Sequence, residues 1–164
     1  MQSKDRINNF AVQIATVNGT GSSSANTLLM KAIFRMGIPV VGKNYFPSNI
    51  QGLPTWYEIR VTAEGYLARS GKVDIMVAMN AQTYAEDLAS VVTNGVLIYD
   101  ASWPRAELEV RSDITVLPIP LSKMCNESFT GARARILMKN IAYVGAIAAL
   151  IEIDRDVVRQ LLSE

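Results

Sequence analysis

The sequence predicts an α/β fold of three layers, α/β/α, in which a mostly parallel sheet carries an inserted β-hairpin. Residues 10–17 form a nearly continuous apolar run rich in β-branched side chains, which is typical of a strand buried on both faces. Strand-like runs then alternate with helical patterns, which favours parallel strands with helices on both sides. A length of 164 residues suits one domain, expected over residues 1–164.

The first forty residues predict a strand, a glycine-rich loop, a helix and a second strand. Apolar side chains after the loop recur at helical spacing, and Gly37 is expected to end this helix. Residues 38–41 then predict the second strand, which completes a βαβ unit. The helical stripe consists of Ala25, Leu28, Leu29, Ala32, Ile33 and Met36.

An antiparallel hairpin is predicted next. Residues 43–54 contain two prolines and a glycine, which indicate a loop. Residues 55–70 follow with period-two alternation, which places Tyr57, Ile59 and Val61 on one face. A turn at 63–65 and a returning strand at 66–69 complete the expected hairpin.

The α/β alternation resumes in the second half of the chain. Gly95 is expected to end the next helix, and Asp154 is a good N-cap for the last one. The second half of the long late helix is apolar all round and is expected to be buried. We predict strands at 73–79, 96–99 and 114–119 and helices at 81–92, 131–151 and after 154.

Composition excludes several classes of function. Hydrophobic residues make up 49% of the chain and the net charge is +1, so neither nucleic acid nor an anionic membrane is expected as a partner. The chain has no histidine and a single cysteine, Cys125, which excludes a Cys/His zinc site and a histidine-based catalytic triad. The longest apolar stretch, 141–151, is shorter than the ~20 residues of a membrane span. A lone cysteine favours a reducing compartment, and we expect a cytoplasmic protein.

The loop VNGTGSSSANT is the best candidate site. A loop at the carboxyl end of the first strand is the usual ligand position in open α/β sheets, and the following helix offers unpaired N–H groups. The alternative is a tight turn in which a serine caps the helix. The pattern G-x-G-x-x-S lacks the third glycine of the dinucleotide fingerprint, and no P-loop lysine follows. The candidate anion-binding residues are Gly19, Thr20, Gly21, Ser22, Ser23 and Ser24.

Two stretches, GTGSSSANTLLMKAIFRMGIPV and GKNYFPSNIQGLPTWYEIRV, resemble the gamma domain of 2-oxoacid:ferredoxin oxidoreductases. The resemblance is closest to the gamma domain fused at the N-terminus of the alpha subunit in 2-oxoglutarate-type enzymes. It extends to VDIMVAMN, VLIYD and KNIAYVGAIAALIEID, and SNIQGLPTW is its most specific part. Other members carry G-x-G-G-Q-G in the first loop, where this chain has G-T-G-S-S-S.

The resemblance implies a role in an enzyme that oxidatively decarboxylates a 2-oxoacid to an acyl-CoA and passes electrons to ferredoxin. The gamma domain of that family is thought to help bind coenzyme A and to cover the active-site entrance. Thiamine diphosphate, Mg²⁺ and the iron–sulfur clusters are expected in partner alpha or beta subunits or domains. This agrees with the residue count, since one cysteine cannot hold a cubane cluster. The chain alone is expected to be inactive.

Further residues are candidates for contact with coenzyme A or the joint active site. Asn26 lies in the first helical turn, and Lys43 follows the second predicted strand as a point charge for phosphate. Ser48, Asn49 and Gln51 are expected at the mouth of the joint site, or else bonded to their own loop. For Asn26 and Lys43 the alternative is a solvated side chain.

Two other functions remain open at this stage. One is a stand-alone nucleotide-binding or CoA-binding module that uses the glycine loop, and the other is a structural docking domain that binds no ligand. Trp56 or Tyr57 is expected to contact a partner while the other packs in the core, and Arg133, Arg135 and Lys139 are expected on a solvated or interdomain face. The sequence does not select the 2-oxoacid, the oligomeric state, or a complete subunit over a fragment.

Overall fold

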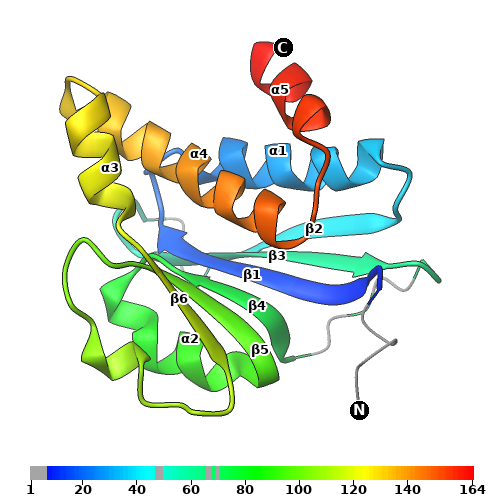
Figure 1. Ribbon diagram of the computed structural model, residues 1–164, viewed down its shortest axis with the longest axis horizontal. Helices are drawn as coiled ribbons and strands as arrows, with labels where there is room; N and C mark the ends of the chain where they lie inside the picture. Colours follow the sequence, from blue (N-terminus) through cyan, green and yellow to red (C-terminus); the bar gives the residue numbers. More distant parts are fainter. Residues whose placement is uncertain (1–6, 47–49, 66–67, 69–70) are drawn as a thin grey trace.

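The computed structural model describes residues 7–46, 50–65, 68 and 71–164. In these residues, strands and helices alternate along most of the chain, as the sequence predicts (Figure 1). The strands are β1 (Asn9–Val17), β2 (Val40–Tyr45), β3 (Pro54–Thr62), β4 (Val73–Ala78), β5 (Val91–Asp100) and β6 (Thr115–Ile119). The helices are α1 (Ser22–Arg35), α2 (Tyr84–Ser90), α3 (Leu121–Ser128), α4 (Ala132–Leu150) and α5 (Arg155–Ser163), with 3₁₀ turns η2 (Ala81–Thr83) and η3 (Ala106–Leu108).

The strands form one sheet in the order β2-β3-β1-β4-β5-β6. The pairs β1–β4, β4–β5 and β5–β6 are parallel, whereas β3 is antiparallel to both β1 and β2. Every strand except β3 therefore runs in the same direction. The predicted fold class, a mostly parallel sheet between helical layers with an antiparallel insertion, is confirmed.

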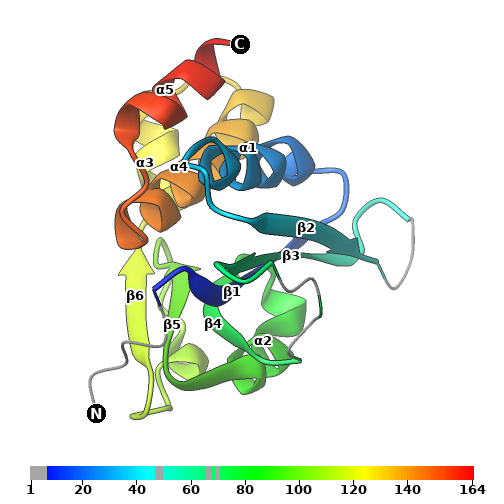
Figure 2. The ribbon, with the colours of Figure 1, turned by 90° about the vertical axis from the view of Figure 1, so that its right-hand side faces the viewer.

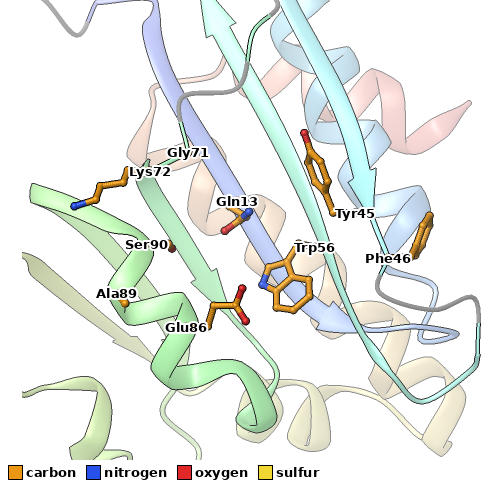
Figure 3. Close-up of a pocket in the computed structure, with 9 residues that line it drawn as sticks. All are labelled: Gln13, Tyr45, Phe46, Trp56, Gly71, Lys72, Glu86, Ala89 and Ser90. Carbon is orange, nitrogen blue, oxygen red and sulfur yellow. The ribbon is translucent and has the colours of Figure 1, made fainter.

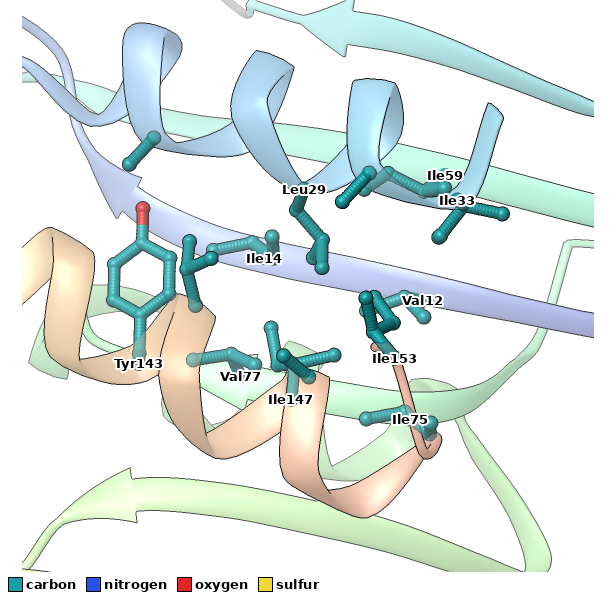
Figure 4. Close-up of a cluster of buried hydrophobic side chains, with 14 of the residues drawn as sticks. Val12, Ile14, Leu29, Ile33, Ile59, Ile75, Val77, Tyr143, Ile147 and Ile153 are labelled. Atoms are coloured by element: carbon teal, nitrogen blue, oxygen red, sulfur yellow. The ribbon is translucent and has the colours of Figure 1, made fainter. Parts of the chain in front are cut away.

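Two hydrophobic cores lie on the two faces of this sheet. Because successive side chains of a strand point to opposite faces, Val12 and Ile14 of β1 enter one core while Ala11 and Ala15 enter the other. Helices α1 and α4 cover the first core (Figure 4), and α2 covers the second. Figure 2 shows α2 on the side of the sheet opposite to α1, α4 and α5.

The antiparallel hairpin is formed by different residues from those predicted. The alternation at 55–62 does mark a strand, β3, but its partners are β1 and β2. The hairpin is thus β2–β3, in which β2 ends at Tyr45 and β3 begins at Pro54. The expected return strand at 66–69 falls largely on residues outside the described part. Since β3 separates β1 from β2, the two strands of the predicted βαβ unit are not neighbours.

Several predicted helix boundaries change. Gly37 has a φ of 79° and ends α1 as predicted, and the Asp154 side chain accepts from Asp156 N at the start of α5. By contrast, α2 ends at Ser90 rather than near Gly95, and β5 begins immediately afterwards. Helix α3 was not predicted. It is a single short helix that follows Pro120.

The long helix α4 is buried on one side only, which corrects the prediction that its second half is buried all round. Tyr143, Val144 and Ile147 are buried in the first core, whereas Gly145 and Leu150 are exposed. No helix of the described residues is long and apolar enough to cross a bilayer.

Candidate functional site

The glycine loop joins the carboxyl end of β1 to α1 with two left-handed residues. Gly19 has a φ of 88° and Gly21 a φ of 79°, values that L side chains rarely adopt. A Cβ atom at Gly21 would lie 2.5 Å from Leu137 Cδ2, so the loop also packs tightly against α4. Backbone conformation and the lack of space for a Cβ atom therefore both favour glycine at these two positions.

Helix α1 begins without a side-chain cap. Its N-cap residue is Gly21, which makes no side-chain capping hydrogen bond. The serine cap considered from the sequence is therefore absent. Ser22 is instead buried, and its Oγ lies 3.0 Å from Thr16 Oγ1. Because no side chain caps the helix, the first-turn N–H groups and the positive end of the helix dipole remain available to an anion.

Neighbouring segments hold the loop in place. Asn18 N donates to Leu53 O at 2.9 Å, and Gly52 N donates to Asn18 O at 3.0 Å, which ties the loop to the segment before β3. From α4, Asn140 Nδ2 donates to Thr20 O at 2.9 Å. The glycine loop is thus held between the 50–53 segment and α4, and the structure brings Gln51 beside it.

A cavity of about 530 Å³ opens at this position. Its walls combine loop backbone, the Gln51 amide, the Arg133 guanidinium and two exposed apolar side chains of α4, Ile136 (44% exposed) and Leu137 (40%). We call it the glycine-loop cavity. Its described lining residues are Val17, Asn18, Gly19, Thr20, Gly21, Gln51, Gly52, Arg133, Ile136 and Leu137.

Arg133 was not singled out for this cavity from the sequence, where it was assigned to a solvated or interdomain face. It lies in the first turn of α4, two residues after Gly131, a glycine with a φ of 89°. In the local sequence, only the position of this basic residue close to a turn glycine could have indicated a binding role for Arg133. Its proximity to the glycine loop depends on the packing of α4 against α1, which local sequence does not specify.

The three serines of the loop do not share one environment, since Ser22 is buried and the other two are exposed. Ser23 and Ser24 are exposed and line a separate hollow of about 420 Å³ together with Lys31 and Glu164. Asn26 is 2% exposed, and its Oδ1 accepts a 2.8 Å hydrogen bond from the Tyr143 hydroxyl. Asn26 therefore joins α1 to α4 and is neither solvated nor in the lining of the glycine-loop cavity.

Lys43 is not brought to the glycine loop. It lies within β2, opposite Glu58, which is in turn opposite Gln13 of β1. These three residues share the α2 side of the sheet, away from the start of α1. The Lys43 ammonium sits 5.4 Å from the centre of the Tyr45 ring. Ser48 and Asn49 lie outside the described residues.

Of the two aromatic residues at the start of β3, Tyr57 is buried in the first core. Trp56 is half-buried on the α2 side, where its indole Nε1 donates to Asp87 Oδ1 at 2.9 Å. Cys125 is buried, and burial raises the pKa of its thiol, which disfavours the thiolate. Within the described part of the chain, no group of three or more Cys, Asp or Glu side chains is arranged to hold a metal ion.

Comparison with known proteins identifies a family match and several relatives. Residues 11–164 match the family model described as pyruvate ferredoxin/flavodoxin oxidoreductase. A curated relative, subunit alpha of 2-oxoacid:ferredoxin oxidoreductase 2 from Aeropyrum pernix, is 29% identical over 82 residues, which are 50% of this chain and 13% of that protein. The chain therefore spans a small part of the length of this relative.

Solved structures share the fold. A 2-oxoglutarate:ferredoxin oxidoreductase from Magnetococcus marinus, with 2-oxoglutarate, coenzyme A and succinyl-CoA bound, superposes with a TM-score of 0.82 at 23% identity. The match covers 96% of this chain and 27% of that one. The gamma subunit of a keto/oxoacid ferredoxin oxidoreductase from Geobacter sulfurreducens gives a TM-score of 0.72 at 15% identity, over 93% of this chain and 84% of that one.

Proposed function

The chain belongs to the pyruvate ferredoxin/flavodoxin oxidoreductase family, and from that membership we propose that it is the gamma-type subunit or domain of a 2-oxoacid:ferredoxin oxidoreductase. The single observation that carries the proposal is the family match over residues 11–164. The chain works within a larger assembly, of 2-oxoglutarate or pyruvate type, in the cytoplasm. It is inactive alone.

Within that assembly, the glycine-loop cavity binds coenzyme A. The uncapped first turn of α1 and the Arg133 guanidinium suit phosphate or diphosphate, since backbone N–H groups and arginine both form charge-assisted bonds to phosphate oxygens. Ile136 and Leu137 supply apolar contact for the pantetheine arm. The Magnetococcus relative, whose structure contains coenzyme A and succinyl-CoA, supports this choice of ligand.

The same surface closes the active-site entrance against a thiamine-bearing partner. Ile136 and Leu137 are exposed beside the cavity, and exposed apolar side chains next to a ligand site favour contact with another surface. When bound by the partner, thiamine diphosphate with Mg²⁺ would supply the decarboxylation chemistry, and iron–sulfur clusters there would supply the route for electrons to ferredoxin. This chain's residues position coenzyme A and exclude water.

Coenzyme A binding is tested by calorimetry with the chain in its native assembly. Arg133→Ala removes the only guanidinium that lines the described cavity, and we expect an affinity loss of about tenfold, equivalent to about 1.4 kcal/mol. Arg159→Ala is the matched control, because Arg159 is an exposed arginine on α5 that pairs with Asp156. Equal affinities for the two variants would remove Arg133 from the proposal.

The alternatives give different results. A stand-alone nucleotide module predicts saturable coenzyme A binding by a chain that purifies without partners. A structural docking domain predicts partners but no coenzyme A binding. Anaerobic purification from the native host, followed by identification of the accompanying chains, separates the stand-alone module from the proposed function, which predicts a thiamine-containing, cluster-bearing partner. Calorimetry with coenzyme A on that assembly then separates the docking domain from the proposed function.

A further inference from the structure

A second cavity, of about 510 Å³, lies on the α2 side of the sheet, opposite to the side covered by α1 (Figure 3). Helix α2 has only 7 residues and packs over β4 and β5, and no helix of the described residues covers the β1–β3–β2 part of this face. We call it the α2-side cavity. Its described lining residues are Gln13, Tyr45, Phe46, Trp56, Gly71, Lys72, Glu86, Ala89 and Ser90.

Gln13 lies at the bottom of this cavity, on a face of β1 where its neighbours are apolar. It is a polar side chain that is 5% exposed and lines the cavity. Its neighbours on the same face of β1, Ala11 and Ala15, are buried in the second core. Its polar end, turned into the cavity, is suited to a ligand.

An aromatic wall stands beside Gln13. Trp56 and Tyr45 are direct cross-strand neighbours on β3 and β2 and line the cavity together. The indole of Trp56 is held at its edge by Asp87, whose other carboxylate oxygen accepts from Thr83 Oγ1 at 2.7 Å. Since Asp87 is fully buried, this chain of bonds fixes the Trp56 ring before any ligand arrives.

We propose that the α2-side cavity binds the adenine base of a nucleotide. A carboxamide has one donor and one acceptor that match adenine N7 and the 6-amino group, whereas the corresponding edge of guanine offers two acceptors. The Trp56 and Tyr45 rings provide a surface on which a purine stacks. Lys72 at the cavity wall suits a phosphate, and a volume of about 510 Å³ falls within the usual range of small-molecule sites.

The adenine has two sources, a free nucleotide or coenzyme A itself. Neither is assumed by the proposal, because the α2-side cavity shares no lining residue with the glycine-loop cavity. Binding at one cavity can therefore fail while binding at the other persists.

The test is photolabelling with 8-azido-AMP of the protein as purified from its host, with its partner chains, followed by mapping of the labelled peptides. We expect label on peptides that contain Tyr45 or Trp56, and protection by AMP at concentrations about tenfold lower than by GMP. Protection by coenzyme A at concentrations well below those needed with AMP assigns the site to the coenzyme, and protection by AMP at the lower concentration assigns it to free nucleotide. Label confined to other peptides, or equal protection by AMP and GMP, would overturn the proposal.

A variant adds an independent measurement. Gln13→Leu removes the carboxamide at nearly constant size and is expected to reduce labelling at least tenfold, while Gln160→Leu, at an exposed position on α5, leaves it unchanged. Arg133→Ala is also expected to leave this labelling unchanged. Unchanged labelling of Gln13→Leu would contradict the proposal. If that variant does not fold, the comparison of protection by AMP with protection by GMP on the unaltered protein still tests the adenine site.

Discussion

At the scale of single residues, Asp87 is the clearest case of a side chain whose charge opposes its surroundings. It is fully buried, and burial raises its pKa from 3.8 to about 6 even though Trp56 and Thr83 donate to it. A carboxyl with a raised pKa in the folded state binds its proton more tightly there than in the unfolded chain. Its contribution to stability is therefore fully present below about pH 4 and is lost as the pH rises through about 6.

Asp87→Asn makes this pH dependence measurable. The amide oxygen can still accept from Trp56, but position 87 no longer titrates. We expect the free energy of unfolding of the unaltered chain, relative to the variant, to fall by about 3 kcal/mol between pH 4 and pH 7, because one pKa unit corresponds to about 1.36 kcal/mol. Urea unfolding of both proteins at several pH values measures it. A constant difference across that range would show that Asp87 does not titrate as described.

Gly42 and Gly145 form a matched pair of glycines. A Cβ atom at Gly42 in β2 would lie 2.1 Å from Tyr57 Oη and 2.8 Å from Met30 Sδ, both of which belong to the packed side of the sheet. Gly42→Ala is expected to lower the free energy of unfolding by about 1–3 kcal/mol through overpacking. Gly145→Ala, at an open helical position in α4, is expected to raise it by about 0.5–1 kcal/mol. Thermal unfolding of the two variants checks both signs, and the same sign for both would refute the steric argument.

At the scale of elements, the contact between α1 and α4 combines apolar packing with one buried hydrogen bond. The Tyr143 hydroxyl donates to Asn26 Oδ1, and both side chains are buried. Tyr143→Phe leaves the Asn26 oxygen without this donor, so we expect the free energy of unfolding to fall by about 1–3 kcal/mol. Chemical denaturation of Tyr143→Phe provides the measurement.

A double-mutant cycle with Asn26→Ala isolates the bond from the general cost of each substitution. The double variant is expected to be less destabilised than the sum of the two single variants by about 0.5–3 kcal/mol. Additive effects would mean that the two side chains stabilise the fold separately. In that case the α1–α4 contact depends on apolar packing alone.

The predictable elements are those whose side-chain period fixes their structure locally. The apolar run of β1, the stripe of α1 and the N-cap Asp154 each specify their own element, and all three are found. The period of β3 correctly assigned its faces, but a period does not name a strand's partners, and the hairpin was therefore placed at the wrong residues. The composition of α4 did not reveal which of its faces is buried, because small and apolar residues occupy the exposed face as well.

The candidate site was predictable in the same partial way. The position of the glycine loop follows from its local chemistry, and both of its glycines adopt left-handed conformations. Arg133 is exposed, as predicted, but its place beside the glycine loop was not predicted, because it depends on how α4 packs. The expected place of Lys43 at that loop was wrong, because the register of β2 puts it on the opposite face. The role of Asn26 likewise depends on Tyr143, which is 117 positions away.

At the scale of the whole molecule, one sheet supports two cores and two cavities. β1 contributes alternate side chains to both cores, its carboxyl end leads into the glycine loop, and its central Gln13 forms the floor of the α2-side cavity. The two faces therefore share a backbone, although they share no lining residues. Loss of packing on either face should loosen the same strands.

This shared strand predicts that the two cores unfold together. Leu29→Ala removes packing on the α1 side and Leu97→Ala removes it on the α2 side, and both side chains are fully buried. Each variant is expected to lose about 2–5 kcal/mol of unfolding free energy, as is usual for truncation of a buried leucine. Leu162→Ala, at a half-exposed position on α5, serves as the control, with an expected change within about 0.5 kcal/mol.

The measurement is urea unfolding followed by two probes in a Trp103→Phe background, where Trp56 is the only tryptophan and reports on the second core. Far-ultraviolet circular dichroism reports mainly on the helices, most of which lie over the first core. Coincident transitions for both probes in each variant would establish one cooperative unit. If Leu29→Ala shifts the dichroism transition while leaving that of Trp56 in place, β1 does not couple the two faces, and each cavity then depends on the stability of its own layer.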